Sequence, residues 1–371
     1  VYPASTPIYM ELVKNGAVAK LLETGAIVKT AFCGPCFGAG DTPANNAFSI
    51  RHSTRNFPNR EGSKVQNGQV SSVALMDARS IAATAANKGY LTAATDMDVN
   101  YTKPKYFFDK TIYENRVFDS HGVADPNQEI QFGPNIKDWP AMSALPENLV
   151  LKVVSEIHDP VTTTDELIPS GETSSFRSNP LGLAEFALSR KDPEYVGRAK
   201  AIQKAQKAVE ADECPGKAFE EVAPVMQAIK AAFPEKDFHD GRLGDNIGFG
   251  STIFAVKPGD GSAREQAASC QKVLGGWANI ANEYATKRYR SNLINWGMLP
   301  FIIDEGELPF RNLDYLFLPD IRKAIADGAT EFTAYVVKEG KLEPFTLKMG
   351  ALTPDEQEII LKGCLINYYR G

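Results

Sequence analysis

Two cysteines separated by a glycine and a proline give the sharpest chemical signal in the sequence. Cys33 and Cys36 form the run Cys-Gly-Pro-Cys. A dithiol redox site needs this run at the start of a helix, whose dipole lowers the pKa of the first thiol. Residues 37–43 contain two glycines and a proline, which would not sustain that helix. The context therefore excludes a thioredoxin-like site.

A structural zinc site is also disfavoured, because it needs four ligands, commonly two cysteine pairs or one pair with histidines. The other cysteines stand singly and the histidines show no ligand spacing: Cys214, Cys270 and Cys364, and His52, His121, His158 and His239. Two readings of the pair stay open from the residues alone. It could be half of an iron–sulfur site, with thiolates on a Gly/Pro turn, or a pair of inert core thiols.

Three further segments concentrate groups that could bind or transform an acid. Residues 53–60 read Ser-Thr-Arg-Asn-Phe-Pro-Asn-Arg, residues 163–177 begin Thr-Thr-Asp-Glu and end Phe-Arg, and residues 259–265 read Gly-Asp-Gly-Ser-Ala-Arg-Glu. Guanidinium groups bind carboxylates in a bidentate way, so several arginines suit a di- or tricarboxylate. Taken singly, Arg55 and Arg60 would be a solvated pair, and Ser262 would be a helix N-cap.

Together, the cysteine pair and these segments resemble the aconitase family along nearly the whole chain. The resemblance implies that Cys33 and Cys36 are ligands of a [4Fe–4S] cluster. It implies substrate contacts from Thr54, Arg55, Arg60 and Arg177. It also implies that Ser262 is the catalytic base, with Arg264 supporting it and Asp165 in the polar network of the active site.

The function implied by this resemblance is a [4Fe–4S] hydro-lyase acting on a small hydroxy-polycarboxylic acid. In such an enzyme the iron acts as a Lewis acid on the substrate hydroxyl, and the serine moves the α-proton. A serine can act as a base only where backbone N–H groups at a helix N-terminus and a guanidinium stabilise its anion. The alternative is a non-catalytic aconitase-fold protein with a binding or regulatory role, for which RNA is a candidate ligand.

Several departures from the family pattern bear on activity. Thr54 replaces an asparagine, Glu166 a histidine and Ala263 a serine, which leaves the substrate undefined. The third cluster cysteine of the family lies further upstream than the residues before Cys33. We therefore expect a C-terminal fragment that holds no stable cluster and is inactive alone. Its expected partners are the substrate and the missing N-terminal domains of the same protein.

The helices and strands expected around these groups indicate an α/β protein. The family resemblance implies a remnant of an aconitase-type α/β/α domain at residues 1–102, a linker at 103–145 and a swivelling β/β/α domain at 146–371. The apolar pattern predicts strands at 26–32 and from Leu149, and helices at 72–88, 197–211 and 218–232. Thr353 to Glu356 form a capping box with proline at N1, which predicts a last helix.

Charge and cysteine usage limit the cellular setting. The formal net charge of −6 argues against a general nucleic-acid or membrane-surface role. No run of about 18 apolar residues is present. Five cysteines, an odd number, without an export signal favour a reducing compartment, so we expect a cytoplasmic protein.

Overall fold

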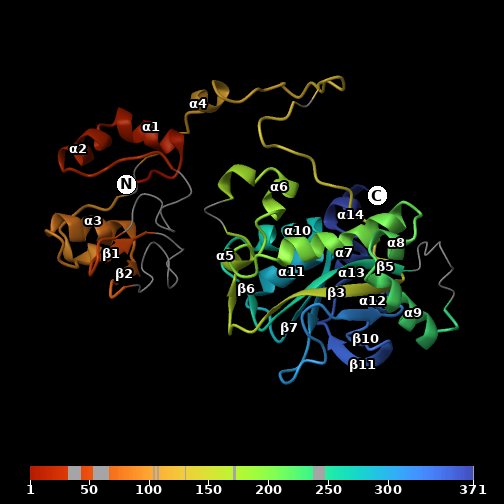
Figure 1. Cartoon of the computed structure of the whole chain (residues 1–371). Helices are drawn as coiled ribbons and strands as arrows, with labels where there is room; N and C mark the ends of the chain where they lie inside the picture. Colours follow the sequence, from red (N-terminus) through yellow and green to blue (C-terminus); the bar gives the residue numbers. More distant parts are fainter. Residues whose placement is uncertain are drawn as a thin grey trace. The chain divides into compact units, whose positions relative to one another are not determined.

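The computed structural model describes residues 1–31, 43–52, 67–102, 105–106, 108–129, 131–169, 173–236 and 247–370. The chain divides into two compact units, Val1–Gln128 and Glu129–Gly371 (Figure 1). This division falls within the predicted 103–145 linker. The domain limits at residues 102 and 146 stay predictions.

The first unit combines short helices with one pair of strands. Its elements are α1 (Thr6–Lys14), α2 (Ala17–Glu23), β1 (Phe48–Arg51), β2 (Ser72–Leu75), α3 (Ala78–Ala86), the 3-10 helix η2 (Ala94–Asp96) and α4 (Thr111–Glu114). Strands β1 and β2 pair in parallel, with Phe48 opposite Ser72. The side chain of Asp77 caps α3 by accepting hydrogen bonds from the backbone N–H groups of Arg79 and Ser80.

One prediction for this unit was wrong, and another was confirmed only in part. Within the described part of the chain, residues 26–31 form no strand: Ile27 is 69% exposed, and the segment exchanges two backbone hydrogen bonds with Val1, at Ile27 O and Lys29 N. A strand needs a longer ladder of partners. The predicted helix at 72–88 begins only at Ala78, because residues 72–75 pair with β1 and Asp77 supplies the cap.

The second unit is built on a closed barrel with the strand order β10-β11-β8-β7-β5-β3-β9. Its strands are β3 (Asn148–Ile157), β5 (Ile247–Ala255), β7 (Gly276–Ala281), β8 (Leu299–Ile302), β9 (Tyr315–Leu318), β10 (Glu331–Lys338) and β11 (Lys341–Lys348). The pairs from β3 through β5 and β7 to β8 are parallel, and β9, β10 and β11 join by antiparallel pairs. Every residue of β5 is buried, as expected for a parallel strand covered on both faces.

The helices of this unit connect the parallel strands and cover the barrel. They are α5 (Thr164–Leu167), the 3-10 helix η3 (Ser174–Phe176), α6 (Pro180–Ala184), α7 (Tyr195–Glu210), α8 (Pro215–Ala218), α9 (Val222–Ala232), α10 (Arg264–Val273), α11 (Lys287–Asn295), α12 (Ile321–Ala326), α13 (Pro354–Lys362) and α14 (Leu365–Arg370). In Figure 1, α7 and α10 lie on one side of β3, and the β10–β11 hairpin lies on the other. The α/β class expected from the sequence is confirmed.

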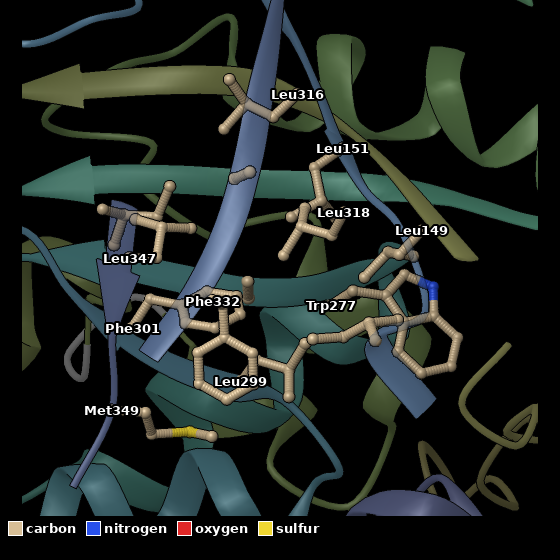
Figure 2. Packing of buried hydrophobic residues seen from close by; sticks show 14 of the residues in the cluster. Leu149, Leu151, Trp277, Leu299, Phe301, Leu316, Leu318, Phe332, Leu347 and Met349 are labelled. Atoms are coloured by element: carbon tan, nitrogen blue, oxygen red, sulfur yellow. The ribbon is translucent and has the colours of Figure 1, made fainter. Parts of the chain in front are cut away.

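The barrel encloses one of the unit's hydrophobic clusters. Figure 2 shows side chains from several of the strands meeting in its interior, including Leu151, Leu318, Phe301, Phe332 and Leu347. Each of these five side chains is at most 5% exposed. Burial of apolar surface on this scale fixes the barrel as a rigid support for the loops at its rim.

The expected helices of this unit are confirmed, with small differences at their ends. The helix predicted at 197–211 is α7, and the one predicted at 218–232 is divided into α8 and α9. The predicted capping box opens α13, where Thr353 and Glu356 exchange side chain-to-backbone hydrogen bonds of 2.9 and 3.2 Å.

Candidate active site

A short strand pair brings together two of the motifs identified in the sequence. Strands β4 (Thr162–Thr163) and β6 (Pro258–Asp260) run in parallel, with Thr163 opposite Asp260. Just beyond this pair, the backbone N–H of Ala263 donates to Thr164 Oγ1 at 3.3 Å. The segments that carry Asp165 and Ser262 therefore lie side by side, although about a hundred residues separate them in the sequence.

Two glycines make this close approach possible. Gly261 has φ +127°, and a Cβ placed on it would lie 2.2 Å from Thr164 Oγ1. Gly259 has φ +97°, and its Cβ would lie 2.3 Å from the ring of Tyr289. Side chains rarely adopt such backbone angles, and neither position has room for one. The Gly-x-Gly spacing thus fits the loop closely against β4 and α11.

Ser262 stands just before α10 and is not its cap. The N-cap residue is Ala263, whose side chain makes no capping hydrogen bond, and α10 begins at Arg264. Ser262 is exposed and Arg264 is half-buried. The side chain of Ser262 is therefore presented at the positive end of a ten-residue helix.

Asp165 is exposed in α5 and pairs with Arg190, whose Nη1 lies 2.9 Å from Asp165 Oδ2. Arg190 was not identified in the sequence, because it follows α6 in a turn without any motif. Both side chains are about half exposed, at 52% and 47%. Such a pair orients the carboxylate but adds little to stability.

Glu166, which stands where the family pattern has a histidine, has a local structural role. Its carboxylate accepts hydrogen bonds from the backbone N–H and the hydroxyl of Thr163, at 2.7 and 2.9 Å. The backbone N–H of Glu166 donates in return to Thr163 Oγ1, which completes a capping box for α5. Its charge is further balanced by Lys191 Nζ at 3.6 Å.

Lys191 joins this helix to the loop that precedes β4. Its ammonium group lies 2.7 Å from Asp159 Oδ1. The hydrogen bond with Asp159 raises the pKa of Lys191, and the same bond lowers the pKa of Asp159. No motif in the sequence indicates this contact, which depends on the turn after α6.

A buried polar network supports the loop from behind. The hydroxyl of Tyr289 donates to Asn279 Oδ1 at 2.9 Å and accepts from Gln271 Nε2 at 2.9 Å. Asn279 Nδ2 donates to Gln271 Oε1 at 2.6 Å. All three residues are buried, so the ring that contacts Gly259 is held in one orientation.

Arg177 is exposed at the end of η3. The turn packs against α6, and Phe176 meets Phe186, just after this helix, with ring centroids 5.4 Å apart. Helix α6 packs in turn against α10. The structure therefore connects Arg177 to the serine loop through one intervening helix, and gives no direct contact between them among the described residues.

The remaining predicted site residues lie outside the described ranges: Cys33, Cys36, Thr54, Arg55 and Arg60. Among the cysteines that are described, Cys270 and Cys364 are buried at 2% and 1% exposure. Burial raises the pKa of the Cys270 thiol, which opposes metal ligation. No group of three or more potential metal ligands occurs within the described residues.

Because the Asp165–Arg190 pair is exposed, we expect Asp165→Asn to change the free energy of unfolding by less than about 1 kcal/mol. Urea unfolding of the two proteins at neutral pH measures this difference, and Arg190→Gln is the matched variant on the other side of the pair. A loss well above this limit for either variant would show that the carboxylate supports the fold. Any loss of activity in Asp165→Asn could then not be assigned to chemistry.

No helix in the described part of the chain has the length and apolar character needed to cross a membrane.

Comparison with known proteins connects both units to one family. Residues 1–83 match the model of the aconitase family (aconitate hydratase). Residues 251–306, which include the serine loop, match the model of the aconitase C-terminal domain.

Individual relatives match over shorter stretches. A probable 3-isopropylmalate dehydratase large subunit of Methanosarcina mazei is 44% identical over 64 residues, which is 17% of this chain and 15% of the relative. A methanogen homoaconitase large subunit of Methanocaldococcus jannaschii is 32% identical over 97 residues, 26% of this chain and 22% of the relative. The chain thus spans between 15% and 22% of the length of these curated relatives.

A solved 3-isopropylmalate dehydratase from Methanocaldococcus jannaschii aligns with 60% of this chain and 93% of its own, at 23% identity and a TM-score of 0.34, and this alignment supports no further inference. The two family models match separate parts of the sequence, one in each compact unit. The chain is thus similar to the aconitase family in a segment of each unit.

Proposed function

We propose that the protein to which this chain belongs is a [4Fe–4S] hydro-lyase that adds water to, or removes it from, a small hydroxy-polycarboxylic acid. The observation that carries the proposal is the pairing of β4 with β6. It sets the segment of Asp165 against the segment of Ser262 and Arg264. A chance resemblance of two separate motifs gives no reason for them to be neighbours in space.

In this proposal the residues of the second unit handle protons and carboxylates. Ser262 takes the α-proton of the substrate, and its anion is stabilised by the N-terminus of α10 and by the guanidinium of Arg264. Asp165 belongs to the same polar network and is oriented by Arg190. Arg177, Arg55 and Arg60, with Thr54, bind the carboxylates and hydroxyl of the substrate.

The cofactor in this proposal is held by Cys33 and Cys36. When bound, the cluster supplies Lewis acidity toward the substrate hydroxyl. Two thiolates are fewer than such a cluster needs, and the buried Cys270 and Cys364 are unsuited to ligation. We therefore propose a third thiolate from outside these residues, and a chain that is inactive without it.

The first test is the metal content of the intact protein, produced without oxygen and reconstituted with iron and sulfide. We expect about four irons per chain in the intact protein and in a Cys214→Ser control, and a large loss in Cys33→Ser/Cys36→Ser. Residues 1–371 alone should retain no cluster. If the intact protein binds none, the hydro-lyase proposal fails, and a non-catalytic binding protein of the same fold becomes the better explanation.

The second test concerns Ser262 in the protein with its cluster. Ultraviolet absorbance of the unsaturated acid reports the reaction across a panel of hydroxy-polycarboxylates. We expect Ser262→Ala to keep the cluster and substrate binding while lowering kcat by about a hundredfold or more, the range for a positioned acid or base. An unchanged kcat would remove Ser262 from the mechanism.

A further inference from the structure

A cleft behind the serine loop is separate from every residue assigned above. It has a volume of about 360 Å³ and lies between the first turn of α10, the end of α11, α14 and the segment that precedes β3. The residues that define its chemistry are Trp139, Glu265, Asn292, Asn295, Trp296 and Tyr369. This volume is within the range of pockets that hold small molecules.

Two indole rings form one side of the cleft. The centroids of Trp139 and Trp296 are 4.4 Å apart, and the ring planes are inclined at 40°. Trp296 is buried, whereas Trp139 remains 42% exposed. An indole face carries partial negative charge and attracts cations more strongly than the other aromatic side chains do.

Glu265 brings a negative charge to the same cleft. Its Oε1 accepts a hydrogen bond from Trp296 Nε1 at 3.0 Å, which fixes the carboxyl group beside the indole. No lysine, arginine or histidine among the described residues forms an ion pair with it. Burial raises the pKa of Glu265, because water does not fully solvate its charge.

The combination of these groups selects the charge of a ligand. An anion would face the Glu265 carboxylate and the negative face of an indole that the neighbouring ring leaves uncovered. A small inorganic cation would lose its hydration without a set of oxygen ligands to replace it. An alkylated ammonium group loses little hydration, contacts indole faces favourably and neutralises a carboxylate.

We propose that this cleft binds a small organic cation of the alkylated or quaternary ammonium class, against the packed indoles of Trp139 and Trp296 and near the carboxylate of Glu265. The site differs from the proposed hydro-lyase site in both residues and ligand charge. Its test therefore does not depend on the cluster or on turnover.

The test is a titration of the full chain with choline, followed by NMR of the indole N–H groups. The sequence contains three tryptophans, so the signal of Trp277, which lies outside the cleft, is an internal control. We expect saturable shifts for Trp139 and Trp296 only. The uncharged isostere 3,3-dimethyl-1-butanol should bind at least about fivefold more weakly, as expected for the loss of one cation–π contact.

Two variants test separately how the charge of Glu265 and the ring of Trp139 contribute to choline binding. Glu265→Gln keeps an oxygen that can accept from Trp296, and should weaken choline binding about fivefold or more; Trp139→Leu should have a similar effect. Glu283→Gln, on the surface of the same unit, should bind as the wild type does. Equal binding of the uncharged isostere, wild-type affinity in both cleft variants, or no saturable shift would each overturn the proposal.

Discussion

Replacing Lys272 with methionine should stabilise the second unit at neutral pH by up to about 4 kcal/mol. Lys272 lies in α10 and is 5% exposed, with its ammonium 3.6 Å from the centroid of the Trp277 ring. Within the described residues Nζ has no hydrogen-bond partner. Burial therefore lowers the pKa of Lys272 from 10.5 to about 7.

The effect should depend on pH in a defined direction. Between about pH 7 and 10.5 the unfolded chain keeps this proton while the folded chain has lost it, so the unfolded state binds more protons. Stability of the wild type should then rise with pH, relative to Lys272→Met, by at most about 1.4 kcal/mol per pH unit. Below this window both states are protonated, and the folded state bears the full cost of a buried charge.

Urea unfolding of both proteins from pH 6 to pH 10 measures this difference. Methionine preserves the unbranched shape and can contact the Trp277 ring through sulfur. Lys204→Met, on the exposed face of α7, is the control and should follow the wild-type profile. Parallel profiles for wild type and Lys272→Met would show that Lys272 keeps its proton in the folded state.

Gly261→Ala should destabilise the second unit by about 2–4 kcal/mol and separate the two motif segments. The substitution places a Cβ 2.2 Å from Thr164 Oγ1 and forces a side chain into φ +127°. Backbone strain of this kind costs about 1–3 kcal/mol, and overpacking adds a similar amount.

A matched glycine separates these two costs. Gly306 has φ +141°, and a Cβ there would meet nothing within 4 Å, so Gly306→Ala reports strain alone. Thr164→Ala removes the hydroxyl that would clash. We therefore expect the double variant Gly261→Ala/Thr164→Ala to cost at least about 1 kcal/mol less than the sum of its single variants. Strict additivity would show that Thr164 and Gly261 do not touch.

The parts of the fold that the sequence predicted are those set by local signals. The capping box at Thr353 and Glu356 and the apolar pattern of α7 appear directly in the chain. The strand expected at 26–32 had the right composition, but residues 26–31 join no strand ladder in the described part of the chain. Composition cannot supply the neighbour that a strand requires.

The same difference between local signals and long-range contacts applies to the candidate site. The motifs around Asp165 and Ser262 were visible, but their contact was not, because β4 and β6 are too short to leave a periodic pattern. Arg190 and Lys191 were missed because each reaches its partner across a turn, and no sequence motif marks such a contact. The capping role of Glu166 could have been foreseen, since Thr163 and Glu166 have capping-box spacing.

The order of the strands in the barrel has a consequence for synthesis of the protein. The first strand, β3, pairs only with β5 and β9 among the described strands, at Asn148–Ile247 and Leu149–Leu318. A ribosome must therefore release more than 150 further residues before both edges of β3 are covered. Such distant pairing slows folding and exposes strand edges meanwhile. We expect the nascent chain to depend on chaperones until β9 emerges.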